Sequence, residues 1–232
     1  MIKEAIILAG GLGTRLRSAV PDLPKCMAPV AGKPFIDHVI SYYQQQGISR
    51  FVFSLGHRSE VIVEHLAKKY SSLDYETAIE PEPLGTGGAI RHALQFAVNK
   101  TVLALNGDTL FAASVPEIAA LHTQKKADCT LALKTMYNTD RYGVVKINVE
   151  GRITSFHEKQ FYNEATINGG VYALNVESFL ALPFEQKFSF EKDFLEKYFA
   201  ELRFFGVIQQ GYFIDIGIPE DYERAQHELK SE

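Results

Sequence analysis

The sequence predicts an α/β protein with a mixed central sheet, and three observations lead to this prediction. Over the first 125 residues, short apolar runs alternate with segments whose apolar residues recur at helical spacing, which is typical of parallel βαβ units. From about residue 128 short strands follow one another with few helices between them, which predicts a smaller antiparallel lobe. No Gly/Ser-rich linker or repeat divides the chain, so we expect a single domain over residues 1–232.

Each expected element has a local signal in the sequence. Strands are expected at the apolar runs 5–8, 51–55 and 101–105 and at residues 73–79, and helices are expected at 35–46, 60–70 and 89–96. Gly47 ends the first of these helices, and Pro34 suits its first turn. The second half predicts strands at 129–133, 143–147, 153–156, 166–174 and 203–208, with helices at 190–200 and 219–229.

Composition limits the partners of this chain. Of its 232 residues, 46% are hydrophobic and 22% charged, as in an ordinary folded protein. The net charge is -4 and no Lys/Arg block occurs, so nucleic acid is not an expected partner. Cys26 and Cys129 lack metal-ligand spacing, which predicts reduced thiols in a cytoplasmic protein. We expect no signal peptide and no membrane segment.

A glycine-rich stretch follows the first strand, with the sequence Leu8-Ala-Gly-Gly-Leu-Gly-Thr-Arg-Leu-Arg17. Its glycines allow the backbone to turn tightly beside a ligand and to direct N–H groups at phosphates. The guanidinium groups of Arg15 and Arg17 suit a polyphosphate better than a neutral sugar. The chemistry predicted here is therefore binding of a phosphorylated ligand.

Two familiar glycine-rich motifs are excluded. A dinucleotide-binding fingerprint needs a third glycine where this chain has Leu16, and an acidic residue about 20 positions further on. This mismatch excludes a dehydrogenase. A P-loop needs Gly-Lys followed by Ser or Thr, whereas Gly32-Lys33 precedes Pro34.

Two acidic residues are candidate metal ligands. Asp108 follows the strand at 101–105, at the edge where open α/β sheets bind ligands, although its position also suits a structural turn. Asp215 stands within an apolar strand and precedes Gly217, where a carboxylate is costly to bury without a cation. Carboxylate oxygens suit Mg²⁺ bound to a polyphosphate.

The pattern Gly-Gly-x-Gly-Thr-Arg, followed by Pro24-Lys25 and by Val30-Ala-Gly-Lys-Pro34, resembles the signature of the sugar-1-phosphate nucleotidyltransferases. The resemblance covers nearly the whole chain. It implies a Rossmann-like three-layer nucleotidyltransferase fold, in which residues 1–125 mainly bind a nucleoside triphosphate and residues 126–232 mainly bind a sugar 1-phosphate. It also implies Mg²⁺ as the cofactor, and many relatives form homo-oligomers.

The resemblance also implies roles for individual residues. The expected catalytic residues are Arg15 on the triphosphate, Lys25 at the α-phosphate and Lys159 on the sugar phosphate. Nucleotide binding is expected from Leu8, Gly10, Gly11, Gly13, Thr14, Glu80, Gly85, Thr86 and Asp108. Sugar-phosphate binding is expected from Gly143, Glu158, Lys159 and Asn168, and metal binding from Asp108 and Asp215. His157, next to Glu158, is expected to point to the opposite face of its strand.

The nucleobase prediction depends on Glu80, which stands where uridylyl and thymidylyl relatives commonly have Gln. A carboxylate can accept hydrogen bonds from N1–H and the amino group of guanine, so the sequence favours GTP. The chain looks most similar to the branch that uses D-glycero-α-D-manno-heptose 1-phosphate to make GDP-heptose for bacterial surface polysaccharides. The alternatives are a mannose-1-phosphate guanylyltransferase, a uridylyl or thymidylyl transferase for a hexose 1-phosphate, and a non-catalytic nucleotide-sugar sensor.

Overall fold

The first half of the chain supplies four parallel strands to the centre of the molecule. The computed structural model describes residues 1–11, 20, 23–157 and 160–229. The strands are β1 (Glu4–Leu8), β4 (Arg50–Leu55), β5 (Asp74–Ile79) and β6 (Thr101–Asn106), and their bounds differ from the predicted ranges by at most one residue. β1 pairs in parallel with β4 and β6, and β4 pairs in parallel with β5. The predicted parallel arrangement is confirmed.

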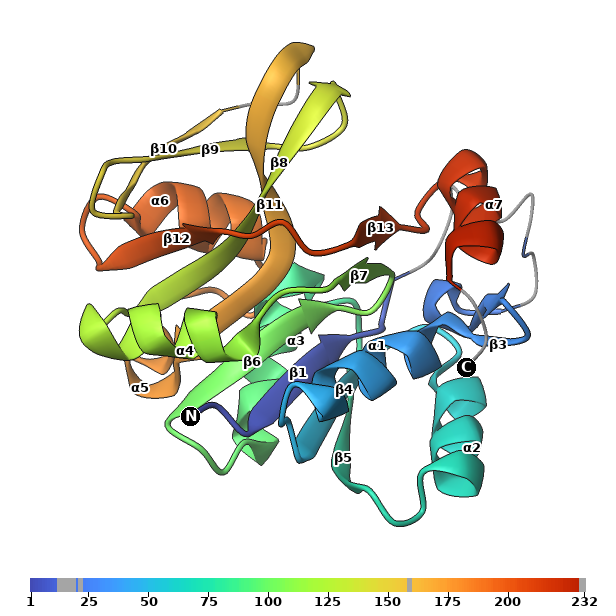
Figure 1. Ribbon diagram of the computed structural model, residues 1–232. Coiled ribbons are helices and arrows are strands. Elements are labelled where there is room, and N and C mark those ends of the chain that lie inside the picture. The colour runs from blue at the N-terminus through green and yellow to red at the C-terminus, as the bar shows by residue number, and fades with distance from the viewer. Residues whose placement is uncertain (12–19, 21–22, 158–159, 230–232) are drawn as a thin grey trace.

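The second half extends this sheet with mainly antiparallel strands. They are β8 (Cys129–Thr139), β9 (Val144–Ile147), β10 (Ile153–His157), β11 (Tyr162–Asn175) and β12 (Phe204–Ile208). The nine strands form one mixed sheet in the order β10-β9-β11-β6-β1-β4-β5, with β8 paired to β11 and β12 paired to β8. β8 and β11 are longer than predicted, and their ends rise above the body of the molecule (Figure 1).

Helices cover both faces of the sheet and give the predicted three layers (Figure 1). One face packs against α1 (Phe35–Gln45), α2 (Ser59–Lys69) and α4 (Val115–Gln124). The other packs against α3 (Gly85–Ala93), the short 3-10 helix η2 (Leu94–Phe96) and the π-helix η3 (Phe190–Leu195), with α5 (Val176–Leu180) and α6 (Glu196–Tyr198) beside them. Alternation along β1 explains this division, because Ile7 faces the first group of helices and Ile6 the second.

Several helical segments differ from the prediction, and α5 is among those not expected. α3 begins at Gly85 rather than at Ala89. Residues 190–200 form η3 followed by the short α6 rather than one α-helix, because a π turn brings residues four and five apart to the same side, and Phe190, Phe194 and Leu195 are all buried. α4 was not predicted, although Ser114 caps its N-terminus by accepting a hydrogen bond from the Glu117 N–H.

The segment that carries Lys25 is not wholly the surface loop that its prolines predict. Lys25–Met27 forms a 3-10 helix, η1, in which Cys26 and Met27 are buried. A small hairpin of β2 (Pro29–Val30) and β3 (Lys33–Pro34) follows and leads directly into α1. Lys25 is therefore held at the edge of the core.

A second small sheet connects the two halves. β7 (Thr109–Phe111) follows β6 closely, and β13 (Phe213–Asp215) pairs with it antiparallel, with Asp215 opposite Thr109. The last helix, α7 (Pro219–Glu228), packs against β13 and β2. Asp215 is thereby fixed beside the end of β6, although more than 100 residues of chain separate it from Asp108.

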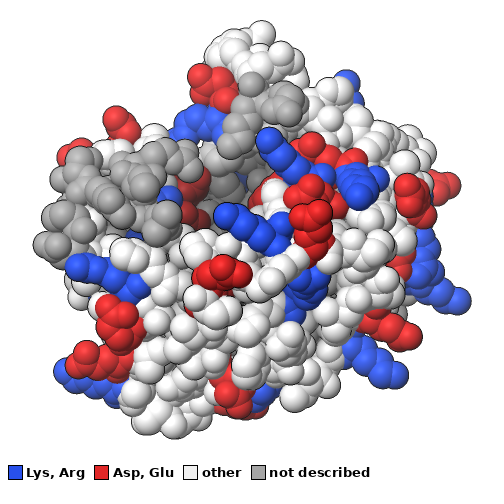
Figure 2. Space-filling model, turned by 180° about the vertical axis from the view of Figure 1, so that it is seen from behind, with Lys and Arg blue, Asp and Glu red and all other residues white. Residues whose placement is uncertain are grey.

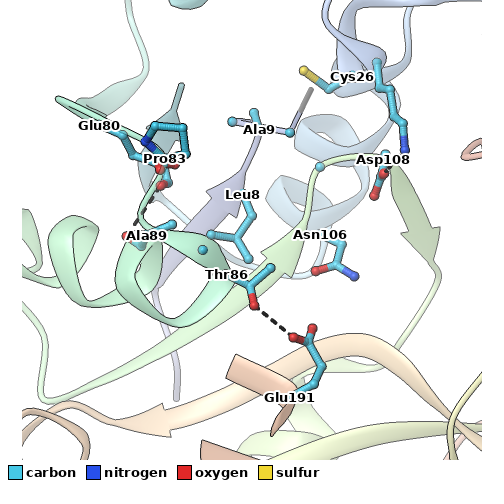
Figure 3. Close-up of a pocket in the computed structure, with 16 residues that line it drawn as sticks. Leu8, Ala9, Cys26, Glu80, Pro83, Thr86, Ala89, Asn106, Asp108 and Glu191 are labelled. Atoms are coloured by element: carbon cyan, nitrogen blue, oxygen red, sulfur yellow. Dashed lines mark hydrogen bonds and ion pairs between the residues drawn. The ribbon is translucent and has the colours of Figure 1, made fainter. Parts of the chain in front are cut away.

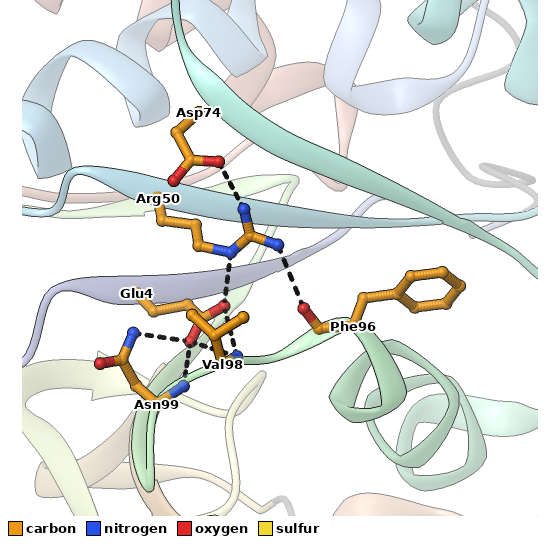
Figure 4. Close-up of polar contacts among 6 residues, drawn as sticks. All are labelled: Glu4, Arg50, Asp74, Phe96, Val98 and Asn99. Atoms are coloured by element: carbon orange, nitrogen blue, oxygen red, sulfur yellow. Dashed lines mark hydrogen bonds and ion pairs between the residues drawn. The ribbon is translucent and has the colours of Figure 1, made fainter.

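A buried carboxylate fastens the opposite end of the parallel strands (Figure 4). Glu4 is fully buried and accepts hydrogen bonds from the backbone N–H groups of Val98 and Asn99 and from the Asn99 side chain. Arg50 Nε lies 3.0 Å from Glu4 Oε1, and the same guanidinium contacts Asp74. The network links β1, β4, β5 and the turn before β6, on the side away from the predicted site.

Charged side chains of both signs are mixed on the surface of the molecule (Figure 2). Acidic and basic side chains are interspersed around a hollow on the face seen in Figure 2, which is unlike the basic stripe typical of nucleic-acid-binding proteins. Within the described ranges, none of the helices combines the length and the apolar character needed to cross a bilayer.

Candidate active site

A pocket, here called pocket A, opens at the carboxyl ends of β1 and β6 and beside the start of α3 (Figure 3). Open α/β sheets bind their ligands at this edge. The lining residues are Leu8, Ala9, Gly10, Gly11, Lys25, Cys26, Ser54, Glu80, Pro83, Gly85, Thr86, Ala89, Asn106, Gly107, Asp108 and Glu191. The structure thus brings together eight of the residues proposed from the sequence: Leu8, Gly10, Gly11, Lys25, Glu80, Gly85, Thr86 and Asp108.

Glu80 is held at one end of pocket A. Its Oε2 accepts a hydrogen bond of 3.0 Å from the Leu84 N–H. A Cβ atom on Gly10 would lie only 2.6 Å from Glu80 Oε1, so glycine is required there for the carboxylate to reach the pocket. Burial raises the pKa of Glu80, and the Leu84 hydrogen bond opposes this shift.

Lys25 and Asp108 form an ion pair in the lining of pocket A. Lys25 Nζ lies 3.2 Å from Asp108 Oδ2, and the two side chains are 15% and 33% exposed. η1 positions Lys25, and the turn between β6 and β7 positions Asp108. A partly buried ammonium beside an acid at the end of a strand can neutralise both a metal-bound carboxylate and a phosphate oxygen.

Asp215 lies next to Asp108. The Ile216 N–H donates to the backbone carbonyl of Asp108 at 3.0 Å, and the Gly217 N–H donates to Asp215 Oδ1 at 2.8 Å. Burial and the negative charge of Asp108 raise the pKa of Asp215, whereas Gly217 and Arg141 lower it. The two predicted metal acids are therefore neighbours that repel each other electrostatically.

This donor set fits Mg²⁺. No cluster of three or more His, Cys, Asp or Glu side chains suited to a metal ion occurs in the part of the chain that is described. Mg²⁺ is usually held by one or two carboxylates together with substrate phosphates and water, rather than by a cage made only of protein groups. Asp108 and Asp215 would supply these carboxylates, and a divalent cation would offset their mutual repulsion.

A second pocket, pocket B, adjoins pocket A on the side of the antiparallel lobe. It is lined by Asn106, Asp108, Thr109, Tyr142, Gly143, Phe156, His157, Asn168, Gly169, Gly170, Tyr172, Ser189, Glu191, Lys192, Leu195, Glu196, Phe213 and Asp215. Gly143 and Asn168, proposed for the sugar phosphate, both lie here and are joined by a hydrogen bond from the Asn168 N–H to the Gly143 carbonyl. Asn168 Nδ2 donates to the Tyr172 hydroxyl, and its Oδ1 accepts from the Gly170 N–H.

Several proposed residues lie outside the described part of the chain. These are Gly13, Thr14 and Arg15 in the glycine-rich stretch, and Glu158 and Lys159 at the end of β10. Their roles remain predictions.

His157 is a further residue in the lining of pocket B. It is the last residue of β10, and it pairs with Val144 beside Gly143. Its ring is hydrogen-bonded to the Ser155 hydroxyl two residues earlier, on the same side of the strand. Its orientation relative to Glu158, which lies outside the described residues, stays a prediction, but alternation along a strand does not exclude its last residue from a pocket at that end.

The sequence reasoning missed three residues of the site. Asn106 and Glu191 line both pockets, and Arg141 contacts Asp215 at 3.9 Å while also pairing with Asp221 of α7. Asn106 directly precedes Gly107-Asp108 at the end of an apolar strand, which was a usable signal. Arg141 and Glu191 follow no motif, and only the fold brings them to the site.

Neither cysteine has the exposed, low-pKa thiol of a reactive nucleophile. Cys26 and Cys129 are free and buried. Burial, together with the charge of Asp108, raises the pKa of Cys26 to about 12, so its thiol stays protonated beside pocket A.

Comparison with known proteins is consistent with this geometry. The family described as Nucleotidyl transferase matches residues 4–232. The chain is 47% identical to D-glycero-alpha-D-manno-heptose 1-phosphate guanylyltransferase of Aneurinibacillus thermoaerophilus, with 98% of each chain covered. It is 42% identical to the protein of the same name from Campylobacter jejuni, with 94% of this chain and 96% of the relative covered.

A solved structure shares the whole fold. HddC from Yersinia pseudotuberculosis, crystallised in complex with GMP-PN, superposes with a TM-score of 0.89 at 35% identity, covering 99% of this chain and 100% of that one. The match over almost every residue, and the pocket at the ends of the parallel strands, lead to one conclusion: this chain belongs to the nucleotidyl transferase family.

Proposed function

We propose that this enzyme transfers a guanylyl group from GTP to D-glycero-α-D-manno-heptose 1-phosphate, producing GDP-heptose and pyrophosphate. The observation that carries the proposal is the pair of adjoining pockets that meet at Asn106 and Asp108, because a transfer reaction needs two substrates side by side. The relatives from Aneurinibacillus thermoaerophilus and Campylobacter jejuni support the choice of sugar. We assign GTP mainly to residues 1–125 and the sugar phosphate mainly to residues 126–232.

Catalysis of this reaction depends chiefly on positioning the two substrates and on neutralising the charge of their phosphates. An oxygen of the sugar phosphate attacks the α-phosphorus in line with the departing pyrophosphate. This oxygen is ionised at neutral pH, so the step needs no general base. Lys25 lies at the boundary of pocket A, where its ammonium would neutralise the α-phosphate. We assign Arg15 to the β- and γ-phosphates and Lys159 to the phosphate of the sugar.

Asp108 and Asp215 would hold Mg²⁺, which supplies charge neutralisation at the triphosphate when bound. Their proximity, fixed by the pairing of β7 with β13, supports this assignment. Arg141 would help to position Asp215, because it contacts Asp215 and is itself held by its pair with Asp221 of α7.

The substrates can be identified by pyrophosphate release. The purified enzyme with Mg²⁺ would be assayed with GTP, UTP, dTTP, CTP and ATP, each paired with the 1-phosphates of D-glycero-D-manno-heptose, mannose and glucose. We expect release with GTP and the heptose. Release with mannose 1-phosphate instead would favour the activity named for the Mycobacterium tuberculosis relative, which is 30% identical, and release with no pair would favour a non-catalytic sensor. Size-exclusion chromatography with light scattering tests whether the chain forms a homo-oligomer, as many relatives do.

A further inference from the structure

Glu191 stands in the wall between pocket A and pocket B. With Asn106 and Asp108 it lines both of them. Its Oε2 accepts hydrogen bonds from the hydroxyls of Thr86, at 2.8 Å, and Ser189, at 3.1 Å. Its Oε1 has no hydrogen-bond partner among the residues described, and Figure 3 shows the carboxylate directed toward Thr86 and Asn106. One acceptor oxygen is therefore available to a ligand.

The position of this carboxylate is fixed by the residues beneath it. Phe190 and Phe194, on either side of Glu191 in η3, are 1% exposed and pack in an aromatic cluster with Phe179. η3 is a π-helix, a rare form that occurs frequently at functional sites. A side chain on such a rigid base is preorganised for one partner geometry.

The segment before η3 is fastened to the start of α3. The Gly87 N–H donates to the Phe188 carbonyl at 3.0 Å, the Phe188 N–H to the Leu84 carbonyl at 3.1 Å, and the Phe190 N–H to the Thr86 hydroxyl at 2.9 Å. A Cβ atom on Gly87 would lie 2.2 Å from the Phe188 ring. Glycine is therefore needed at residue 87 to admit this segment.

We infer that Glu191 is a specificity-determining residue that accepts a hydrogen bond from a hydroxyl group of the acceptor sugar. This rests on the proposed function. An ionised carboxylate only accepts hydrogen bonds and repels phosphate, so the neutral hydroxyls of a sugar are the matching donors. The hydrogen bond from Thr86 also links this carboxylate to the start of α3, which lines pocket A.

The ribose of the nucleotide also carries hydroxyls, but the surroundings of Glu191 favour the acceptor. The same segment contributes four further residues to pocket B and none to pocket A: Ser189, Lys192, Leu195 and Glu196. Glu191 therefore belongs to a segment whose other lining residues all face pocket B, the proposed acceptor pocket.

The test compares Glu191→Gln and Glu191→Ala with the matched control Glu185→Gln, an exposed acid on the preceding segment. We expect KM for the sugar phosphate to rise about 10- to 100-fold in both Glu191 variants, since the lost hydrogen bond is to a charged group. KM for GTP and the dissociation constant of GTP, measured by calorimetry, should stay within about twofold of the control. The melting temperature should stay within about 2 °C of the control.

Two results would overturn the inference. A rise confined to KM for GTP, with weaker GTP binding, would assign Glu191 to the ribose. Unchanged KM values for both substrates would show that Glu191 contacts neither. The assay uses whichever pair the unmodified enzyme turns over, so a substrate other than GTP or heptose 1-phosphate would refute the proposed function while still testing Glu191.

Discussion

Replacing Glu80 by Gln should weaken the use of GTP, and the structure sets the size of the effect. Oε2 of Glu80 is engaged by the Leu84 N–H, so only Oε1 is available to a base in pocket A. In the variant, the Gln oxygen would keep the Leu84 contact, and the amide nitrogen would then present donors to the N1–H and amino donors of guanine. The loss of one charge-assisted hydrogen bond, about 1.5–3 kcal/mol, corresponds to a fall of about 10- to 150-fold in kcat/KM for GTP.

The same substitution should change the pH dependence. Burial raises the pKa of Glu80, so its carboxylate becomes protonated at a higher pH than that of a solvated glutamate. Because the protonated group loses its acceptor charge, KM for GTP should rise as pH falls through this raised pKa, and Glu80→Gln should lack that rise. Steady-state kinetics with GTP and UTP across pH measures both effects. An unchanged GTP-to-UTP preference in Glu80→Gln would refute the assignment of Glu80 to the base.

Three further substitutions test catalysis, metal binding and stability. Lys25→Ala should lower kcat at least about 100-fold with the melting temperature retained, because the charge at the α-phosphate is lost; near-normal turnover would remove this role. Asp215→Asn should raise the Mg²⁺ concentration that gives the half-maximal rate by at least about tenfold. An unchanged Mg²⁺ titration would refute the assignment of Asp215 as a metal ligand. Glu4→Gln should lower the free energy of unfolding by about 1.5–3 kcal/mol in urea titrations, because it removes the charge of a fully buried carboxylate that pairs with the partly exposed Arg50, whereas Glu76→Gln on the exposed side of β5 should have little effect.

The parallel half of the sheet was predictable because its signals are local. β1, β4 and β6 are short apolar runs, and burial on both faces demands that composition. Asp108 could be placed at the site for the same reason, because a residue directly after a buried parallel strand must lie at the carboxyl edge of the sheet.

The rest of the site depends on contacts between distant parts of the chain. The position of Glu191 follows from the aromatic packing of η3 and from its hydrogen bond with Thr86, more than 100 residues away. The ion pairs of Arg141 with Asp215 and Asp221 need β13 and α7 to be in place first. No periodicity along the sequence encodes such pairings, so the reasoning from local patterns could not find them.

Gly85, Gly87 and Gly88 can be located as a motif from the sequence. The structural reason for these glycines cannot be read from the sequence. Their lack of side chains predicts close approach of a ligand, and Gly85 does line pocket A. Yet a Cβ atom on Gly85 would lie 2.6 Å from the Phe188 carbonyl, and one on Gly87 would meet the ring of the same residue. These glycines at the start of α3 therefore admit the segment around Phe188 while Gly85 also lines pocket A, and a substitution there should raise KM for both substrates. In an enzyme that works by positioning, this shared contact is how one loop can align two substrates.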